Sequence, residues 1–269
     1  MSEVYCEASL NYAGLTDYEP RTVSIRNGRE AISDLSYEQC GFSFIRHESK
    51  VKNWQDEAEV DSVHVPEIAE LVTELMGCKA AVVYPALVRS PKTAKQLSDY
   101  APIESVHSDY TEDYRKMVRD PDHAYQDFLN PLLKANGLSH EDVVNAERIA
   151  VIQFWRNIGA EHPDRPLALC DASTVDRSEM IPILVPFYGG VRLDFEAFAV
   201  RTPEKVEDHH WYAFPKMQKD EVMVFRTYDS RCDDEGRAVY TPHTAFLDPT
   251  AGTDAPLRES VEMRALCLF

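Results

Sequence analysis

The stretch MIPILVPFYGGVRLDFEAFAV, residues 180–200, indicates the fold class. It contains two runs rich in β-branched and aromatic residues, separated by two glycines, and such runs bounded by turn residues are typical of strands. The same pattern recurs through the second half of the chain, at residues 149–158, 166–171, 210–214, 221–229, 238–248 and 260–269. Eight or so short strands predict a double-sheet barrel of the jelly-roll type.

Helical patterns precede and interrupt these strands. Residues 65–78, VPEIAELVTELMGC, place apolar residues at helical spacing between Pro66 and Gly77. A strand-like run follows at 80–87, and residues 111–146 form a helical insertion. We therefore expect a mainly β fold with flanking helices (α+β), built on a double-stranded β-helix core of the cupin-like kind. No repeat or low-complexity linker divides the chain, so we expect a single domain over residues 1–269.

Composition narrows the class of protein. The 46 acidic residues outnumber the 28 basic ones, giving a net charge of -18, and no block of basic residues is present, so nucleic acid and anionic membranes are disfavoured partners. The N-terminus lacks a signal-peptide pattern and no long apolar run follows, so we expect a soluble cytoplasmic protein. The six cysteines lack C-x-x-C spacing, which argues against a zinc ribbon or a disulfide framework.

The pattern H-x-D is a candidate metal motif. It occurs three times, at His107/Asp109, His140/Asp142 and His162/Asp164. On a strand, residues i and i+2 share a face, whereas on a helix they point about 200° apart. The second pair lies at a helix start, where capping explains the aspartate, and the third lies in a proline-containing loop. The first pair ends the extended segment 102–111, so we interpret it as two metal ligands, with a solvated strand end as the alternative.

A metal site needs a third ligand, and His243 in a late extended segment is the best placed histidine. Two imidazoles and one carboxylate leave open coordination positions. Arg258 and Ser260 follow on one face of the last strand-like run. A guanidinium and a hydroxyl can hold the distal carboxylate of a dicarboxylic acid whose other end chelates the metal. By itself, the arginine of an R-x-S pattern more often forms a surface salt bridge. The assignment therefore depends on the order of the three motifs along the chain, H-x-D, then His, then R-x-S.

With these motifs in place, the chain resembles the Fe(II)- and 2-oxoglutarate-dependent dioxygenase superfamily. More narrowly, it resembles the fungal and bacterial family of gibberellin desaturase and the cephem methoxylase component. The resemblance spans about residue 40 to the C-terminus and rests on VHSDYT, FWRNIG, PLALCDAST, FPKMQKDEVMVFRTYDS, PHTAFLDP and RESVEMRALCLF. It implies a double-stranded β-helix, Fe(II) bound by His107, Asp109 and His243, and 2-oxoglutarate held by Arg258 with Ser260.

The resemblance implies an oxidative tailoring enzyme that uses O2 as co-substrate. It would hydroxylate or desaturate a small specialised metabolite and release succinate and CO2. Two alternatives use the same scaffold: a zinc-dependent hydrolase at the same triad, and a non-catalytic ligand-binding barrel. We expect a small-molecule substrate and no nucleic-acid or membrane partner, and a homodimer stays open.

The sequence also allows predictions for other side chains near the expected site. Glu262 and Arg264 share the strand face of Arg258 and Ser260, so we favour a buried pair beside the cofactor pocket, with Arg264 as the fallback oxoglutarate ligand. We expect Arg89, after the run 80–87, to be a surface arginine, with contact to an anionic substrate or cofactor as the alternative. We expect Trp155 to pack in the core, with substrate contact as the alternative.

Overall fold

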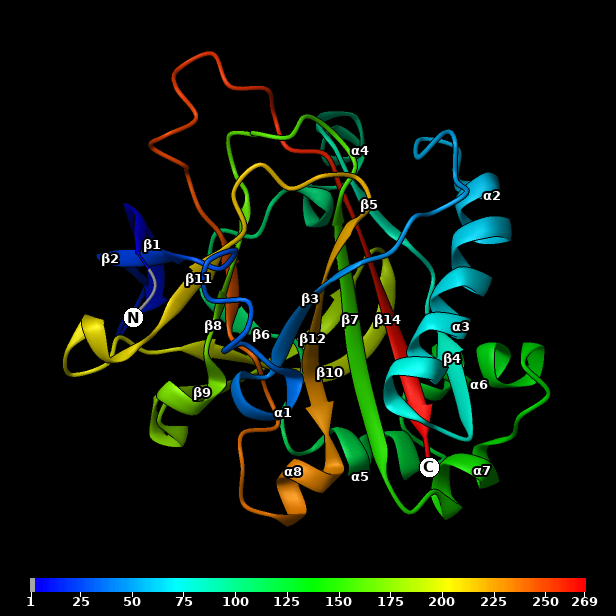
Figure 1. Ribbon diagram of the computed structural model, residues 1–269. Helices are drawn as coiled ribbons and strands as arrows, with labels where there is room; N and C mark the ends of the chain where they lie inside the picture. The colour runs from blue at the N-terminus through cyan, green and yellow to red at the C-terminus, as the bar shows by residue number, and fades with distance from the viewer. Residues whose placement is uncertain (1–2) are drawn as a thin grey trace.

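The computed structural model describes residues 3–269, which form two curved β-sheets packed against each other (Figure 1). The larger sheet has eight strands, in the order β1 (Val4–Ala13), β2 (Tyr18–Asn27), β11 (Trp211–Ala213), β8 (Leu167–Cys170), β13 (His243–Ala245), β6 (His107–Ser108), β10 (Val191–Val200) and β9 (Met180–Tyr188). The smaller sheet runs β3 (Phe42–Arg46), β12 (Glu221–Asp229), β7 (Ile149–Asn157), β14 (Ser260–Leu268) and β4 (Ala80–Val83), and β5 (Leu87–Arg89) also pairs with β14. Neighbouring strands are antiparallel, apart from the parallel pair of β2 and β11. The predicted jelly-roll core with flanking helices is confirmed.

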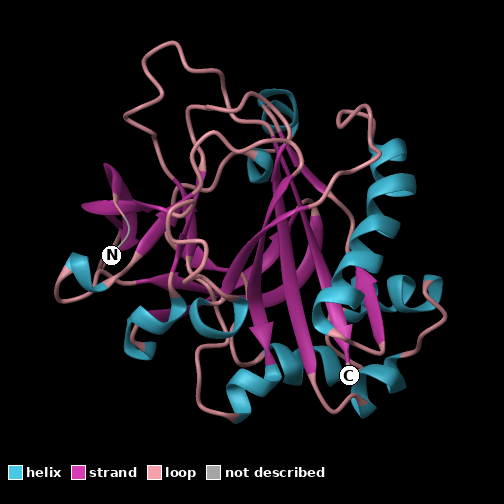
Figure 2. Cartoon of the chain, in the orientation of Figure 1, coloured by secondary structure: helices cyan, strands magenta, loops and turns pink. Residues whose placement is uncertain are grey.

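The helices lie outside the sheets (Figure 2). The α-helices are α1 (Tyr37–Cys40), α2 (Glu57–Glu59), α3 (Val65–Met76), α4 (Pro91–Gln96), α5 (Tyr114–Arg119), α6 (Gln126–Ala135), α7 (His140–Asn145) and α8 (Ser230–Asp234). One π-helical turn covers Val60–His64, and 3-10 turns cover Ser98–Tyr100, Ala172–Thr174, Arg177–Glu179 and Val206–Asp208. Helices α5, α6 and α7 form the predicted insertion within 111–146. Every helix of residues 3–269 is too short or too polar to span a bilayer.

Helix α3 covers the outer face of the smaller sheet. Pro66 lies in its first turn, and Gly77 ends it with a φ of 63°, a left-handed conformation that glycine adopts without strain. Ile68 and Val72 are fully buried there, in one cluster with Ala265 of β14. Side chains alternate along a strand, so the neighbouring positions of β14 face the space between the sheets.

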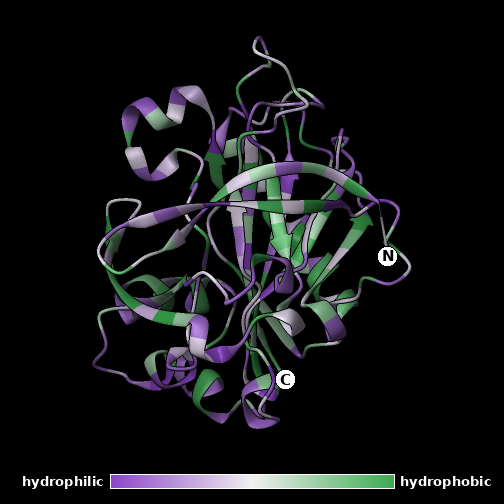
Figure 3. Ribbon diagram, turned by 90° about the vertical axis from the view of Figure 1, so that its left-hand side faces the viewer, coloured by the Kyte–Doolittle hydropathy of each residue, from purple (hydrophilic) through white to green (hydrophobic). Residues whose placement is uncertain are grey.

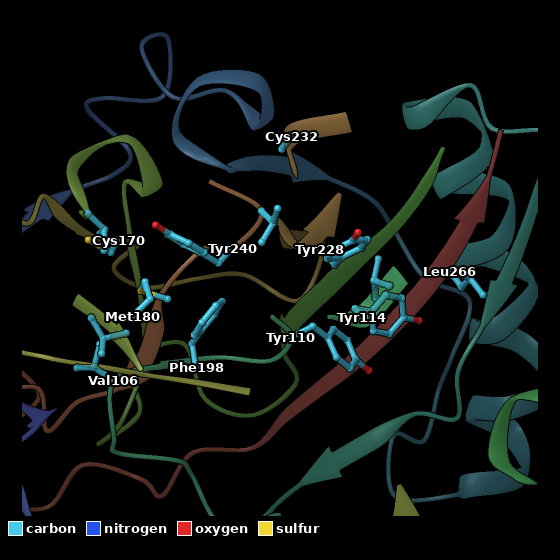
Figure 4. Close-up of a cluster of buried hydrophobic side chains, with 14 of the residues drawn as sticks. Val106, Tyr110, Tyr114, Cys170, Met180, Phe198, Tyr228, Cys232, Tyr240 and Leu266 are labelled. Carbon is cyan, nitrogen blue, oxygen red and sulfur yellow. The ribbon is translucent and has the colours of Figure 1, made fainter. Parts of the chain in front are cut away.

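The main core fills that space between the sheets (Figure 4). Figure 4 shows Tyr110, Tyr114 and Tyr228 side by side near β14, with ring centroids 4.4 Å and 5.1 Å apart for successive pairs. Figure 3 shows that hydrophobic residues concentrate on the central strands and hydrophilic residues on the surrounding loops. The curvature of the two sheets therefore encloses an interior in which polar side chains are the exception.

The strands differ from the prediction in four places. We predicted no strand before residue 80, yet β1, β2 and β3 lie there. The run 80–87 is divided between β4 and β5, and the extended segment 102–111 contains only the short strand β6. The run 238–248 contains only the three-residue strand β13. Strand β1 buries small and aromatic residues in alternation, Cys6, Ala8, Leu10 and Tyr12, a weaker pattern than a run of β-branched residues.

Candidate active site

Two neighbouring strands bring the predicted metal-binding residues together. His107 of β6 and His243 of β13 are register partners, and Asp109 follows β6 directly. One nitrogen or oxygen atom of each side chain lies within 4.8 Å of the others, and the two imidazole centroids are 4.4 Å apart. We call these three residues the His–Asp–His cluster. It lies between the sheets, at the mouth of the interior.

Backbone carbonyls orient both histidines. Nδ1 of His107 lies 2.7 Å from the oxygen of Ser105, and Nδ1 of His243 lies 2.9 Å from the oxygen of Thr241. A carbonyl only accepts, so each Nδ1 carries the proton and each Nε2 keeps its lone pair. Burial, followed by the neighbouring His243, lowers the pKa of His107 to about 4. Both features keep the His107 ring in the neutral form that metal ligation requires.

Asp109 is held by an arginine. Nε and Nη2 of Arg264 donate to the same oxygen of Asp109, Oδ2, at 3.1 Å and 3.0 Å. Burial by itself raises the pKa of the Asp109 carboxyl, but Arg264 and the two histidines outweigh it, and the pKa lies below its ordinary value. Asp109 is therefore a carboxylate at neutral pH.

An apolar pocket opens on one side of the cluster. It has a volume of about 360 Å³. Its walls include Tyr110, Tyr188 and Phe195, and strands β9 and β10 supply many of the other lining side chains. The chemistry of this space suits an uncharged organic molecule.

A polar pocket lies on the other side, and His107 and Arg264 line both spaces. Gln153, Trp155 and Arg258 contribute to its wall. Its volume is about 20 Å³, which is room for about one water molecule. A ligand larger than a water molecule can therefore enter the polar pocket only if side chains of the pocket wall move.

Arg258 is the unusual residue of the polar pocket. Its side chain is buried, and in the described part of the chain, residues 3–269, Nε has no hydrogen-bond partner and Nη1 donates only to the backbone oxygen of Arg165 at 3.2 Å. Burial, followed by the charge of Arg89, lowers the pKa of Arg258 to about 9. A buried cation without a carboxylate partner is costly, and this is the feature that sets Arg258 apart from the other charged residues of the pocket.

Ser260 and Gln153 add further unpaired groups near Arg258. Among residues 3–269, neither the buried Ser260 hydroxyl nor the buried Gln153 Oε1 atom has a hydrogen-bond partner. We predicted that Arg258 and Ser260 share one face of the last strand, but Ser260 is the first residue of β14, Arg258 precedes the strand, and only Arg258 lines the polar pocket.

Comparisons with known proteins identify the family. The sequence profile of the family described as Oxidoreductase/YMDC permease-like domain matches residues 4–268. The chain belongs to this family. Its relatives include the alpha-ketoglutarate-dependent dioxygenase phiK of a fungal species, 28% identical, with 91% of this chain and 84% of the relative aligned. Another is the hydroxylase/desaturase efuI of Hormonema carpetanum, 27% identical over 94% and 85% of the two chains.

A solved structure shares the fold of this family member. It is titled iron and alpha-ketoglutarate-dependent endoperoxidase NvfI, and it superposes with a TM-score of 0.77 at 21% identity, covering 99% of each chain. The predicted membership of the Fe(II)- and 2-oxoglutarate-dependent dioxygenase superfamily, in its hydroxylase/desaturase branch, is confirmed.

One charged residue of this chain lies elsewhere than expected, and the predicted pair of Glu262 and Arg264 is present with further partners. Arg89 is buried rather than on the surface, and it binds Glu262 through both nitrogens of its fork, at 3.2 Å and 2.8 Å. Arg264 lies 3.6 Å from Glu262 and pairs more closely with Asp109. The pair predicted between Glu262 and Arg264 is thus one link of a longer chain. Burial raises the pKa of Glu262, but Arg89 and Arg264 outweigh it and lower the pKa to about 2.

The two other H-x-D pairs lie outside the cluster. Asp142 accepts hydrogen bonds from the backbone and hydroxyl of Ser139, which caps α7 as expected. Asp164 accepts the backbone N–H of Arg258 at 2.9 Å, a contact that the sequence pattern did not reveal. Asp164 of the third pair therefore holds the backbone of Arg258, a residue of the polar pocket, and does not belong to the His–Asp–His cluster.

Proposed function

We propose that this chain is a non-haem Fe(II)- and 2-oxoglutarate-dependent oxygenase. It hydroxylates or desaturates a small organic substrate and releases succinate and CO2. The relatives phiK and efuI carry the names of such enzymes. The observation that carries the proposal is the unpaired guanidinium of Arg258 beside the His–Asp–His cluster. The cluster alone suits several metals, whereas a buried anion site next to it calls for a metal-chelating acid.

In this proposal His107, Asp109 and His243 hold the metal. Two neutral imidazoles and one carboxylate are the donor set preferred by Fe(II) in oxygenases, and they leave further coordination positions open. The free Nε2 atoms and the lowered pKa values of His107 and Asp109 fit this role. The ligands are ready to bind without first losing protons.

Arg258 and Ser260 hold the distal carboxylate of 2-oxoglutarate in the same proposal. The guanidinium offers an unused donor, and the Ser260 hydroxyl is unused as well. The polar pocket has room for about one water molecule. The Arg258 side chain must therefore move when 2-oxoglutarate binds. Its single hydrogen bond to a backbone oxygen leaves it free to do so.

The chemistry divides between cofactor and protein. Bound Fe(II) and 2-oxoglutarate would activate O2 for hydrogen removal from the substrate. The protein orients the metal ligands and supplies an anion site on one side of the metal. On the other side, the apolar pocket positions the substrate and excludes water from it. Because the lining is apolar, the substrate is an uncharged, largely apolar molecule.

Neither alternative accounts for these observations as well. A zinc hydrolase needs the three metal ligands but has no use for an unpaired arginine that awaits a carboxylate. A non-catalytic barrel has no use for two imidazoles oriented by backbone carbonyls. Both alternatives stay testable through the requirement for 2-oxoglutarate.

Anaerobic spectroscopy tests the proposal. Addition of Fe(II) and 2-oxoglutarate to the metal-free protein should produce the visible charge-transfer band of the chelate, and O2 should then release succinate. His243→Ala should abolish the band. The matched control His210→Ala removes a histidine outside the cluster and should keep it. Absence of the band in the wild type, or its survival in His243→Ala, would contradict the proposed site.

The remaining assignments also belong to this proposal. We propose a single domain over residues 1–269, a cytoplasmic location, and no nucleic-acid or membrane partner, for which the net charge of -18 is the support. A homodimer is consistent with edge strand β9, where Leu184 and Phe187 are exposed. Light scattering of the wild type and Leu184→Glu tests the dimer: both samples at monomer mass would exclude it.

A further inference from the structure

Arg264 makes an asymmetric contact with Asp109. Two of its nitrogens, Nε and Nη2, donate to Oδ2. Within residues 3–269, no group donates a hydrogen bond to the other oxygen, Oδ1. An arginine fork more often binds both oxygens of a carboxylate, one nitrogen to each. Here the fork occupies one oxygen and leaves the other free.

We propose that Arg264 is a positioning residue for the metal-binding carboxylate. By holding Oδ2, it directs Oδ1 of Asp109 toward Nε2 of the two histidines and limits the carboxylate to one metal bond. This inference rests on the proposed function, since it assumes that the His–Asp–His cluster binds the metal. Because Asp109 engages Nε and Nη2 of Arg264, Arg258 is the better candidate for oxoglutarate binding.

A chain of buried charges holds Arg264 in place. Arg89 pairs with Glu262, Glu262 lies 3.6 Å from Arg264, and Arg264 pairs with Asp109. The charges alternate in sign, so each buried ion has an opposite neighbour, as buried ions require. Arg89 also donates to the hydroxyl of Tyr188 and to the backbone oxygens of Asp99 and Ala101.

Rigidity of the strand adds to this support. Arg264 lies within β14 and has Gln153 of β7 as its register partner. On its other side, between the residues that pair with β5 and those that pair with β4, its carbonyl accepts the backbone N–H of Tyr84 at 2.7 Å. Contacts on both sides thus restrain its backbone. The guanidinium is fixed both by its charged neighbours and by its strand.

Limiting Asp109 to one bond has a chemical consequence. Two histidines and one carboxylate oxygen leave open positions at an Fe(II) site. A chelating oxoacid takes two of the open positions, and O2 needs another. A second bond from Asp109 would compete for that position. Residues that orient metal ligands typically account for about 10- to 100-fold in metal affinity.

Co(II) titration tests the inference without measuring turnover. Arg264→Leu removes the fork, and Arg264→Lys keeps the charge but cannot donate as a planar fork. Arg148→Leu is the matched control, because Arg148 forms a buried fork with Asp229 at 2.9 Å and 2.6 Å, away from the cluster. We expect Co(II) affinity to fall about tenfold in Arg264→Leu and less in Arg264→Lys. It should be unchanged in Arg148→Leu, and the visible Co(II) spectrum should change only in the Arg264 variants.

The outcomes separate this inference from the proposed function. If the wild type fails to bind Co(II), the cluster itself is misassigned. If the wild type binds Co(II) and Arg264→Leu binds it equally or more tightly with an unchanged spectrum, only the positioning role is wrong. Should Arg264→Leu not fold, Arg264→Lys carries the test, and wild-type affinity and spectrum in that variant would overturn the inference.

Discussion

The guanidinium of Arg258 lies over the indole of Trp155, with Cζ 5.6 Å from the ring centroid. A cation above an aromatic face gains some stabilisation, but the ring cannot neutralise the charge. Arg258 has no carboxylate partner in the polar pocket, because Arg89 engages the nearby Glu262. In the proposed function, the distal carboxylate of 2-oxoglutarate supplies the missing anion.

Arg258→Ala should weaken 2-oxoglutarate binding by about 10- to 100-fold, the worth of a hydrogen-bonded charge pair of roughly 1.5–3 kcal/mol. Metal affinity should stay at the wild-type value. The measurement is an anaerobic titration of the charge-transfer band. Arg156→Ala serves as the comparison, since Arg156 is also buried but binds the backbone oxygens of His47 and Lys219. Loss of metal affinity in Arg258→Ala, with unchanged oxoglutarate affinity, would place the anchor elsewhere.

Ser108→Ala should leave metal binding intact. Ser108 lies between the predicted ligands His107 and Asp109, and its fully buried hydroxyl has no hydrogen-bond partner within the described residues. Replacing an unpaired buried hydroxyl by a methyl group should leave the free energy of unfolding unchanged or raise it by about 1 kcal/mol. Urea unfolding and Co(II) titration measure the two quantities. A variant that no longer binds metal would show that the hydroxyl faces the cluster.

Glu262→Gln should destabilise the protein by about 3 kcal/mol, because it leaves the buried cation of Arg89 without its charge partner. Urea unfolding in the absence of metal gives this difference. Glu19→Gln is the exposed counterpart, since Glu19 pairs with Arg21 at the surface, and it should change nothing measurable. Equal stability of Glu262→Gln and the wild type would mean that Arg89 finds another partner.

Acid should destabilise the fold through His64. Burial lowers the pKa of His64 from 6.5 to about 4, although its hydrogen bond with Glu67 opposes the shift. Between these values the unfolded chain binds the proton and the folded chain does not, so stability falls as the pH decreases. The loss from this residue should be about 2 kcal/mol between pH 6.5 and pH 5.

His64→Gln tests this source of acid sensitivity. The glutamine keeps a hydrogen-bonding group near Glu67 but cannot titrate. Urea unfolding near pH 7 and near pH 5 should show a smaller loss in His64→Gln than in the wild type. Equal losses in the two proteins would assign the acid sensitivity to other groups.

The His–Asp–His cluster could be predicted from the sequence because the alternation of side chains along a strand is a local property. His107 and Asp109 are two residues apart, and the fold brings His243 beside them by pairing β6 with β13. Arg89 shows the limit of this reasoning. Its surroundings along the chain resemble a strand end at the surface, and only the long-range pairing of β5 with β14 places it against Glu262.

The strands before residue 80 show a second limit. In β1 the buried positions are Cys6, Ala8, Leu10 and Tyr12, alternating with polar residues. Small and polar residues have weak strand preferences, and tertiary pairing decides their structure. The pairing of β1 with β2, and the parallel contact of β2 with β11, supply what the local pattern lacks.

The two pockets draw their walls from different parts of the chain. The β9–β10 hairpin supplies much of the apolar wall and no residue of the polar one, whose lining comes from several other strands, among them β7, β13 and β14. Substitutions in the hairpin can therefore reshape the space for the substrate while the anion site stays intact. The binding of a new substrate can therefore evolve while the binding of the co-substrate is kept. To transfer substrate specificity from one relative to another, the β9–β10 hairpin is the first segment to exchange.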